Sequence, residues 1–314
     1  MPFAAVSQSE TVDPQFGQAS TNENMTMIRK ISTKDISELR SRTGAGIGDC
    51  KAALEEAGGD LEQANDLLRK KGIVKAEKRA GRSASEGLIV VAAAADGRDA
   101  AMIDLNCETD FVARTDEFGA LARDLAAHAL AHAEPGINGG ALGTSAFRGK
   151  TVAEVVAEIS GRTGEAMTLA RYARFTQANG LVGSYLHHNG QVGVLVDVQG
   201  PAGDALRALA TDVALHIASA DPVAVSEADI PADLVDRERR IAEEQVAAEG
   251  KPENIRGKIV DGKIRKFVAE RALLSQGFVK DESQTVGALV AEAAKALGGP
   301  VTVVRFARFK VGEV

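Results

Sequence analysis

The pentapeptide RYARF at Arg171–Phe175 occurs a second time, with one aromatic ring exchanged, as RFARF at Arg305–Phe309. A shared register over many positions is not expected of unrelated sequence rich in Ala and Val, so the pattern predicts an internal duplication. The same separation along the chain joins a Thr-Val pair and a Val-Ala-Glu triplet in the two copies, Thr151–Val152 and Val156–Glu158 in the first, Thr285–Val286 and Val290–Glu292 in the second.

Each copy begins with a pattern typical of a β-hairpin. Asp-Gly or Asn-Gly between two alternating apolar runs is a strong hairpin signal, and an amphipathic helical pattern follows each pair of runs. Each half therefore predicts a hairpin, two helices and a closing strand, which is an α+β fold with subdomains at 83–179 and at 180–220 plus 271–314. The hairpin runs are Gly87–Val90 and Ala101–Leu105 around Asp96-Gly97, and Gly180–Val182 and Val194–Val198 around Asn189-Gly190.

A small helical module precedes the duplication. Ser32–Asp35 resembles a helix start, a second helix is predicted over Asp49–Ala57, and Asp60 with Gln63 resembles a capping pair that opens a third. The module and a basic stretch after it occupy 29–82. The stretch from Arg69 to Arg82 has no interleaved aromatic residues for base stacking, so a solvated linker is favoured over an RNA contact. Residues 1–28 contain no Lys or Arg and are expected to form a disordered extension.

Two segments break the duplication and are the best candidates for function. One is the longer connector of the first copy, which contains Phe111 in polar surroundings. Because only 4% of the residues are aromatic and Trp is absent, an aromatic ring in a connector requires an explanation. It either folds back onto the core or fills a pocket of a partner. The other segment is an insertion at 221–270, whose pattern predicts two charged antiparallel helices that project as a hairpin and dock a partner.

Composition and motifs argue against several functions. A net charge of -7 and a pI near 5.4 are unlike a general nucleic-acid binder, and two cysteines favour a reducing cytoplasm. No apolar run approaches the ~20 residues that cross a bilayer. Gly149–Thr151 lacks the spacing and the preceding strand of a phosphate loop, and His128 with His132 lacks further metal ligands. We therefore expect no catalytic site, metal, cofactor, membrane contact, or direct nucleotide or specific nucleic-acid binding.

Two motifs in order resemble the bacterial elongation factor Ts family. They are TGAGIGDCKAAL at Thr43–Leu54 and NCETDFVAR at Asn106–Arg114, and the likeness extends from about Ile31 to Val311. The resemblance implies a ubiquitin-associated-like first module and a coiled-coil dimerisation hairpin in the insertion, hence a homodimer through that hairpin. It also implies guanine nucleotide exchange on the GTPase elongation factor Tu.

The resemblance further implies which residues bind that partner. Phe111 would wedge between helices of the GTPase domain, with Asp110 beside it, and so disturb the Mg²⁺ and phosphate site. Where the family often carries two bulky residues at the tip of the first module, this chain has Ile47 and then Gly48, which predicts a thinner contact. The implied partner-binding residues are Thr109, Asp110, Phe111, Val112, Ile47, Lys51, His216, Val279 and Lys280.

The residues alone leave two other functions open. The chain could be a ubiquitin-associated-like adaptor fused to a scaffold, without effect on nucleotide, in which case Phe111 is dispensable. It could instead be an RNA-binding accessory of translation that uses Arg69 to Arg82, with strongly salt-dependent affinity. An enzyme is the least supported class, because no convergent set of acid, base or metal ligands is visible.

Overall fold

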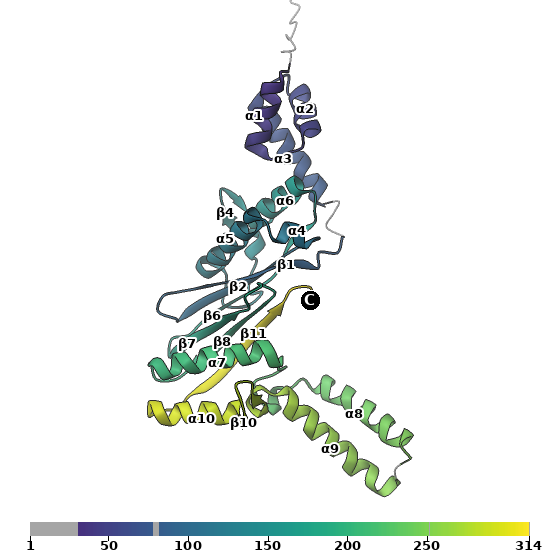
Figure 1. Cartoon of the computed structure of the whole chain (residues 1–314), viewed down its shortest axis with the longest axis vertical. Helices are drawn as coiled ribbons and strands as arrows, with labels where there is room; N and C mark the ends of the chain where they lie inside the picture. The colour runs from purple at the N-terminus through teal and green to yellow at the C-terminus, as the bar shows by residue number, and fades with distance from the viewer. Residues whose placement is uncertain (1–30, 78–81, 251, 314) are drawn as a thin grey trace, which may run out of the picture.

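The computed structural model describes residues 31–77, 82–250 and 252–313. The predicted extension at 1–28 lies outside these residues. The described chain combines helices and antiparallel sheets, as the α+β prediction required, with a three-helix module at one end and a helical hairpin at the other (Figure 1).

The three-helix module consists of α1 (Thr33–Thr43), α2 (Ile47–Glu56) and α3 (Leu61–Glu77). Ser32 and Asp35 form a reciprocal capping box at the start of α1. Helix α2 begins two residues before the predicted position, at Ile47. The module buries a small core made of Leu39, Cys50, Ala53, Leu54 and Ala64.

The basic stretch after the module corrects the prediction of a linker. Residues from Arg69 onward continue α3 as far as Glu77, while Lys78 and Arg79 lie outside the described residues. The helix continues because it packs on α6 (Val152–Thr163): a Cβ added to Gly161 would lie 2.9 Å from the Gly72 Cα atom. Gly72 of α3 and Gly161 of α6 thus permit a close helix crossing, which the sequence around either glycine does not predict.

The first half forms a four-stranded sheet with helices on one face. Its strand order is β1 (Glu86–Ala93), β2 (Asp99–Cys107), β6 (Met167–Thr176) and β3 (Gly136–Ile137), and every pairing is antiparallel. Helices α5 (Asp116–His132) and α6 pack on it through an apolar core that includes Leu105, Phe118, Leu121, Leu125 and Val156.

The second half has the same order of hairpin, helix, helix and closing strand. Its sheet is β11 (Thr302–Lys310), β8 (Val192–Gln199) and β7 (Gly180–Leu186), covered by α7 (Asp204–Ala220) and α10 (Val286–Leu297). The RYARF and RFARF pentapeptides lie in the closing strands β6 and β11, as predicted.

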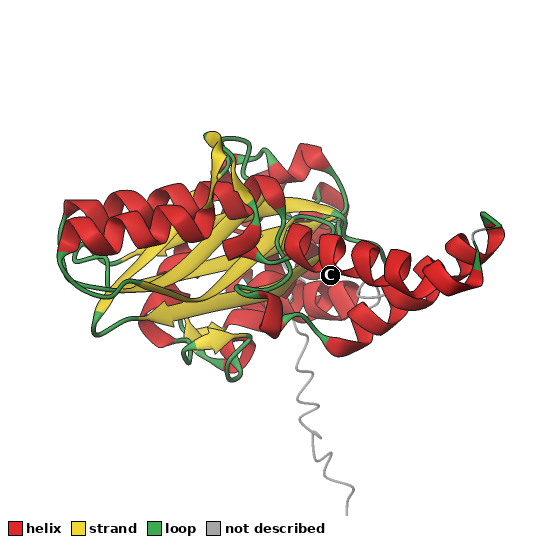
Figure 2. Cartoon of the chain, turned by 90° about the horizontal axis from the view of Figure 1, so that it is seen from below, coloured by secondary structure: helices red, strands yellow, loops and turns green. Residues whose placement is uncertain are grey.

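The two sheets pack face to face, so the core has four layers with helices on both outer sides (Figures 1 and 2). Reciprocal bonds join the two hairpins. The Ile89 amide donates to the Gly190 carbonyl, and the Val182 amide donates to the Gly97 carbonyl, both at 2.8 Å. The buried layer between the sheets includes Ile89, Met102, Phe175, Leu195, Ala307 and Phe309.

The segment between the two helices differs most between the halves. The first half has η1 (Leu142–Thr144), β4 (Ala146–Phe147) and β5 (Lys150–Thr151). The second has η3 (Leu273–Ser275), β9 (Gly277–Phe278) and β10 (Asp281–Thr285), preceded by η2 (Glu227–Asp229), α8 (Ala232–Ala248) and α9 (Glu253–Arg271). Helices α8 and α9 pack on each other through Ala242, Val246, Val260 and Ile264 and project from the core (Figure 2).

Candidate partner-binding site

The connector singled out in the first half forms a short helix that presents an aromatic ring to solvent. Helix α4 (Asp110–Ala113) begins after Thr109, whose hydroxyl caps the Val112 amide. Phe111 is 81% exposed, which excludes the alternative that its ring folds back onto the core. Asp110 stands next to it and pairs with Arg114 at 2.9 Å. An exposed large apolar ring indicates a binding role more strongly than a buried ring does, because its exposure to water does not stabilise the fold.

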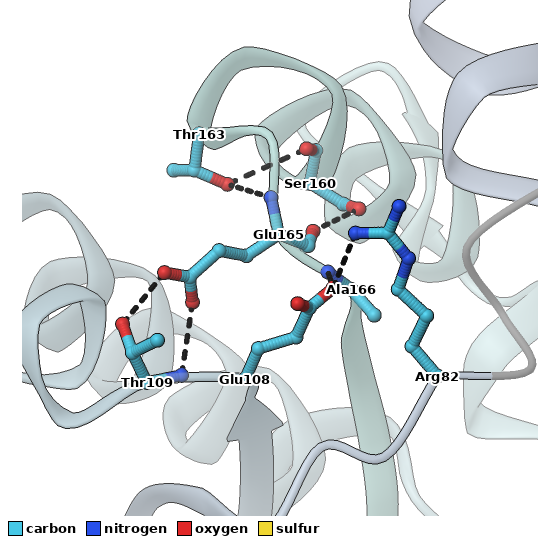
Figure 3. A network of polar contacts seen from close by, with 7 residues as sticks. All are labelled: Arg82, Glu108, Thr109, Ser160, Thr163, Glu165 and Ala166. Atoms are coloured by element: carbon cyan, nitrogen blue, oxygen red, sulfur yellow. Dashed lines mark hydrogen bonds and ion pairs between the residues drawn. The ribbon is translucent and has the colours of Figure 1, made fainter.

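A polar network holds this helix in place (Figure 3). The Thr109 hydroxyl and amide donate to the Glu165 carboxylate at 2.6 and 3.1 Å. On the preceding residue, Glu108 accepts the Ala166 amide at 2.7 Å and pairs with Arg82. The connector is therefore fastened to the turn between α6 and β6. Glu165 lies far from Thr109 in sequence, so sequence reasoning missed this anchor.

The underside of α4 is apolar. Ala113 is buried, and Val112 packs against the core of the first half. The Cys107 thiol donates to the Thr109 carbonyl at 3.2 Å, and burial raises the pKa of Cys107 to about 12. Cys107 is thus a protonated, inert thiol at neutral pH that supports the connector. Phe111 therefore points to solvent from a helix whose opposite side packs on the core of the first half.

In the helical module the predicted contact residues lie at the surface of α2. Ile47 is 60% exposed, and Lys51 is exposed with a distant ion pair to Glu55 at 3.8 Å. A Cβ added to Gly48 would meet nothing within 4 Å, so this position presents only backbone beside Ile47.

In the second half His216 is not a surface residue. It is 1% exposed, and its Nε2 atom lies 2.9 Å from the Gln276 side-chain oxygen. Its Nδ1 atom accepts the Val279 amide at 3.2 Å, and burial lowers the pKa of the ring. The ring is neutral and acts beneath the turn that exposes Val279 and places Lys280 2.6 Å from Asp212.

A groove beside this turn adds His187, which no sequence motif marks as a contact residue. It has a volume of about 340 Å³ and an apolar lining that includes Tyr185, Leu215 and Val279. His187 also lines it and bonds the Tyr185 hydroxyl at 3.0 Å. The sequence around His187 gives no local sign of this groove, because Val279 lies far along the chain.

Other chemistry finds no support among the described residues. Within residues 31–77, 82–250 and 252–313, no three His, Cys, Asp or Glu side chains converge in a way that could hold a metal ion. In the same part of the chain, no helix is both long and apolar enough to cross a membrane. Lys150 pairs with Glu158 and Thr151 caps α6 with Glu154, so the Gly149–Thr151 motif serves as a helix start.

Comparisons with known proteins define the class. The sequence model of "Elongation factor TS" matches residues 108–313. The chain is 45% identical to elongation factor Ts of Aquifex aeolicus (strain VF5), with 91% of this chain and 99% of that protein covered. It is 44% identical to elongation factor Ts of Methylococcus capsulatus (strain ATCC 33009 / NCIMB 11132 / Bath), with 90% and 92% covered. These matches belong to factors of translation elongation in protein biosynthesis. The chain is a member of the elongation factor Ts family.

Proposed function

We propose that this protein is a guanine nucleotide exchange factor that binds elongation factor Tu with GDP and promotes GDP release. Family membership supports the partner, and one observation carries the mechanism: Phe111 is 81% exposed on a helix whose base is bonded to the core. The protein would act by binding, without a catalytic residue or cofactor of its own. The cytoplasm, where translation takes place, is the proposed location.

The proposed mechanism is mechanical displacement. A GTPase holds GDP through backbone amides, a Lys and Mg²⁺, whose ligands lie partly on mobile switch segments. A ring on a fixed base can enter between helices and move those segments without touching the nucleotide. Asp110 lies beside the ring to contact the same surface. By linkage, the factor by which this protein weakens GDP binding equals the factor by which GDP weakens binding of this protein.

Two further surfaces would bind the same partner. One is the α2 edge with Ile47 and Lys51. The other is the Val279–Lys280 turn together with the groove lined by His187. In this proposal His216 contributes by holding the Val279 amide rather than by direct contact.

We also propose the domain division predicted from sequence. A ubiquitin-associated-like module at 29–82 precedes a duplicated core, with subdomains at 83–179 and at 180–220 plus 271–314. The insertion at 221–270 would be the dimerisation hairpin. Ile241 on α8 and Ile255 on α9 are 42% and 39% exposed and would lie in a homodimer contact. Sedimentation of the Ile241→Asp variant tests this, since an unchanged oligomeric state would argue against that contact.

The decisive experiment is release of a fluorescent GDP analogue from elongation factor Tu. We expect the wild-type protein to accelerate release and Phe111→Ala to lose roughly 30-fold or more of that effect, as for a hot-spot side chain. Ile137→Ala is the matched control, because Ile137 is also an exposed apolar residue, on β3. Absence of acceleration by the wild type would contradict exchange activity. A fully active Phe111→Ala variant would contradict only the wedge, as the adaptor alternative predicts.

A further inference from the structure

An apolar groove lies between α6 and β6, outside the surfaces described above. Its volume is about 320 Å³. It is lined by Val152 and Val156 of α6 and by Met167, Leu169 and Tyr172 of β6, and Gly143 of η1 also contributes to the lining. A Cβ added to Gly143 would meet nothing within 4 Å, so the space beside this glycine is open.

The strand that borders the groove has a free edge. On one side β6 pairs with β2 along its length. On the other side β3 pairs with it only at Ala173 and Arg174. Within the described residues, Met167–Arg171 therefore has no strand partner on that side. An unpaired edge beside an apolar groove is the arrangement that accepts an added strand, with backbone bonds for affinity and a pocket for alternate side chains.

The second half shows what side chain such a groove accepts. There Leu274 takes the place that Gly143 has in η1, because both are the middle residues of corresponding 3-10 turns. Leu274, Val301 and Phe306 all pack against the apolar core of the second half, and Val301 and Phe306 stand at the positions that correspond to Met167 and Tyr172 in the first half. The second half thus fills from within the position that the first half leaves open.

We propose that the free edge of β6 binds an extended segment of the same GTPase that meets Phe111, and that this segment inserts an apolar side chain of leucine size into the groove. This proposal rests on the proposed function. Continuity of the surface supports the choice of occupant. Ala166, which lines the groove, bonds Glu108, and the neighbouring Glu165 bonds Thr109 at the base of α4. A partner seated on Phe111 therefore lies at the start of the groove.

The test uses a substitution whose new side chain occupies the groove. Gly143→Leu reproduces the residue of the second half at a position with room for it, and Ala141→Leu places the same side chain on the exposed neighbouring position as control. Hydrogen exchange of the full-length protein is followed with and without elongation factor Tu. We expect amides in Met167–Arg171 to gain protection in the wild-type and Ala141→Leu complexes and not in the Gly143→Leu complex. Gly143→Leu should also weaken partner affinity on the order of tenfold.

The outcomes separate the two proposals. If wild-type protein accelerates GDP release but Met167–Arg171 gains no protection, the groove proposal is overturned while exchange activity stands. Unchanged affinity of Gly143→Leu likewise overturns it. If protection of Met167–Arg171 requires a second copy of this chain or another protein instead of the GTPase, the assigned occupant is wrong. Circular dichroism and unfolding of both variants confirm that each retains the fold.

Discussion

In each half, a corner is formed where the first outer helix (α5 or α7) contacts the segment that leads to the second outer helix (α6 or α10). Both corners are built around a histidine, but the two histidines have different hydrogen-bond partners. In the first half His128 Nε2 lies 2.7 Å from the Ser145 hydroxyl, and in the second His216 Nε2 lies 2.9 Å from the Gln276 oxygen. The second ring also accepts the Val279 amide through Nδ1. A shared internal histidine thus supports segments of different chemistry, and the one in the second half, the Val279–Lys280 turn, carries a proposed contact.

The connectors after the two hairpins differ in the same sense. In the first half the connector forms α4 and exposes Phe111, while in the second the segment between β8 and α7 has no helix of its own. Corresponding layers therefore position one connector that exposes an aromatic ring and one that forms no helix. In the proposed mechanism the partner contacts lie where the halves differ, and stability should depend on what the halves share.

The largest expected effect tests what the halves share. Gly87 and Gly180 begin the two hairpins, and a Cβ at either would lie within 2.2 Å of a carbonyl oxygen on the paired strand, that of Leu105 or Val198. Because neither backbone can yield cheaply, Gly87→Ala and Gly180→Ala should each lower the free energy of unfolding by at least about 4 kcal/mol. Urea unfolding measures this. A large loss at only one of the two positions would break the equivalence.

A smaller effect sharpens the comparison. Arg171 pairs with buried Asp104 and stacks on Phe309, and Arg305 pairs with buried Asp197 and stacks on Phe175. Asp197 also accepts a hydrogen bond from Gln177, whereas the second oxygen of Asp104 has no partner.

We therefore expect Arg171→Ala to cost about 3 kcal/mol, because it leaves a buried carboxylate unpaired, and Arg305→Ala to cost about 1 kcal/mol. Chemical denaturation of the two variants side by side tests the order. Equal losses would show that the bond from Gln177 does not matter.

The smallest effect concerns pH. Burial lowers the pKa of both His128 and His216, so between that lowered pKa and the usual value near ~6.5 the unfolded state binds more protons than the folded state. Stability contributed by these neutral rings is present above about pH 6.5 and is lost as pH falls. His128→Gln and His216→Gln should each reduce this loss by about 1 kcal/mol or less.

Only His216→Gln should also slow GDP release, severalfold, because it removes the acceptor of the Val279 amide. Thermal unfolding at several pH values and the exchange assay separate the two effects. Equal slowing by His128→Gln would contradict the difference between the corners.

Much of the fold was predictable because its signals are local. Asp96-Gly97 and Asn189-Gly190 set both hairpins, and the capping pattern at Ser32 set the first helix. The face-to-face packing of the sheets was not predicted, and α3 was ended too early, because its last turns depend on Gly161 across the crossing. At the site, the exposure of Phe111 excludes packing of its ring on the core, and the partner contact of the ring stays a prediction. The burial of His216 and the anchor from Glu165 could not be predicted, since both depend on partners far along the chain.

The reciprocal stacking of Arg171 on Phe309 and of Arg305 on Phe175 has a consequence for biosynthesis. Strand β6 leaves the ribosome long before β11, and at ~5–20 residues per second the interval is on the order of ten seconds. During that interval the ring of Phe175 and the guanidinium of Arg171 lack the partners that cover them in the finished protein. The first half must therefore persist as an incomplete sandwich until β11 arrives, and this strand covers the first sheet as it completes the second.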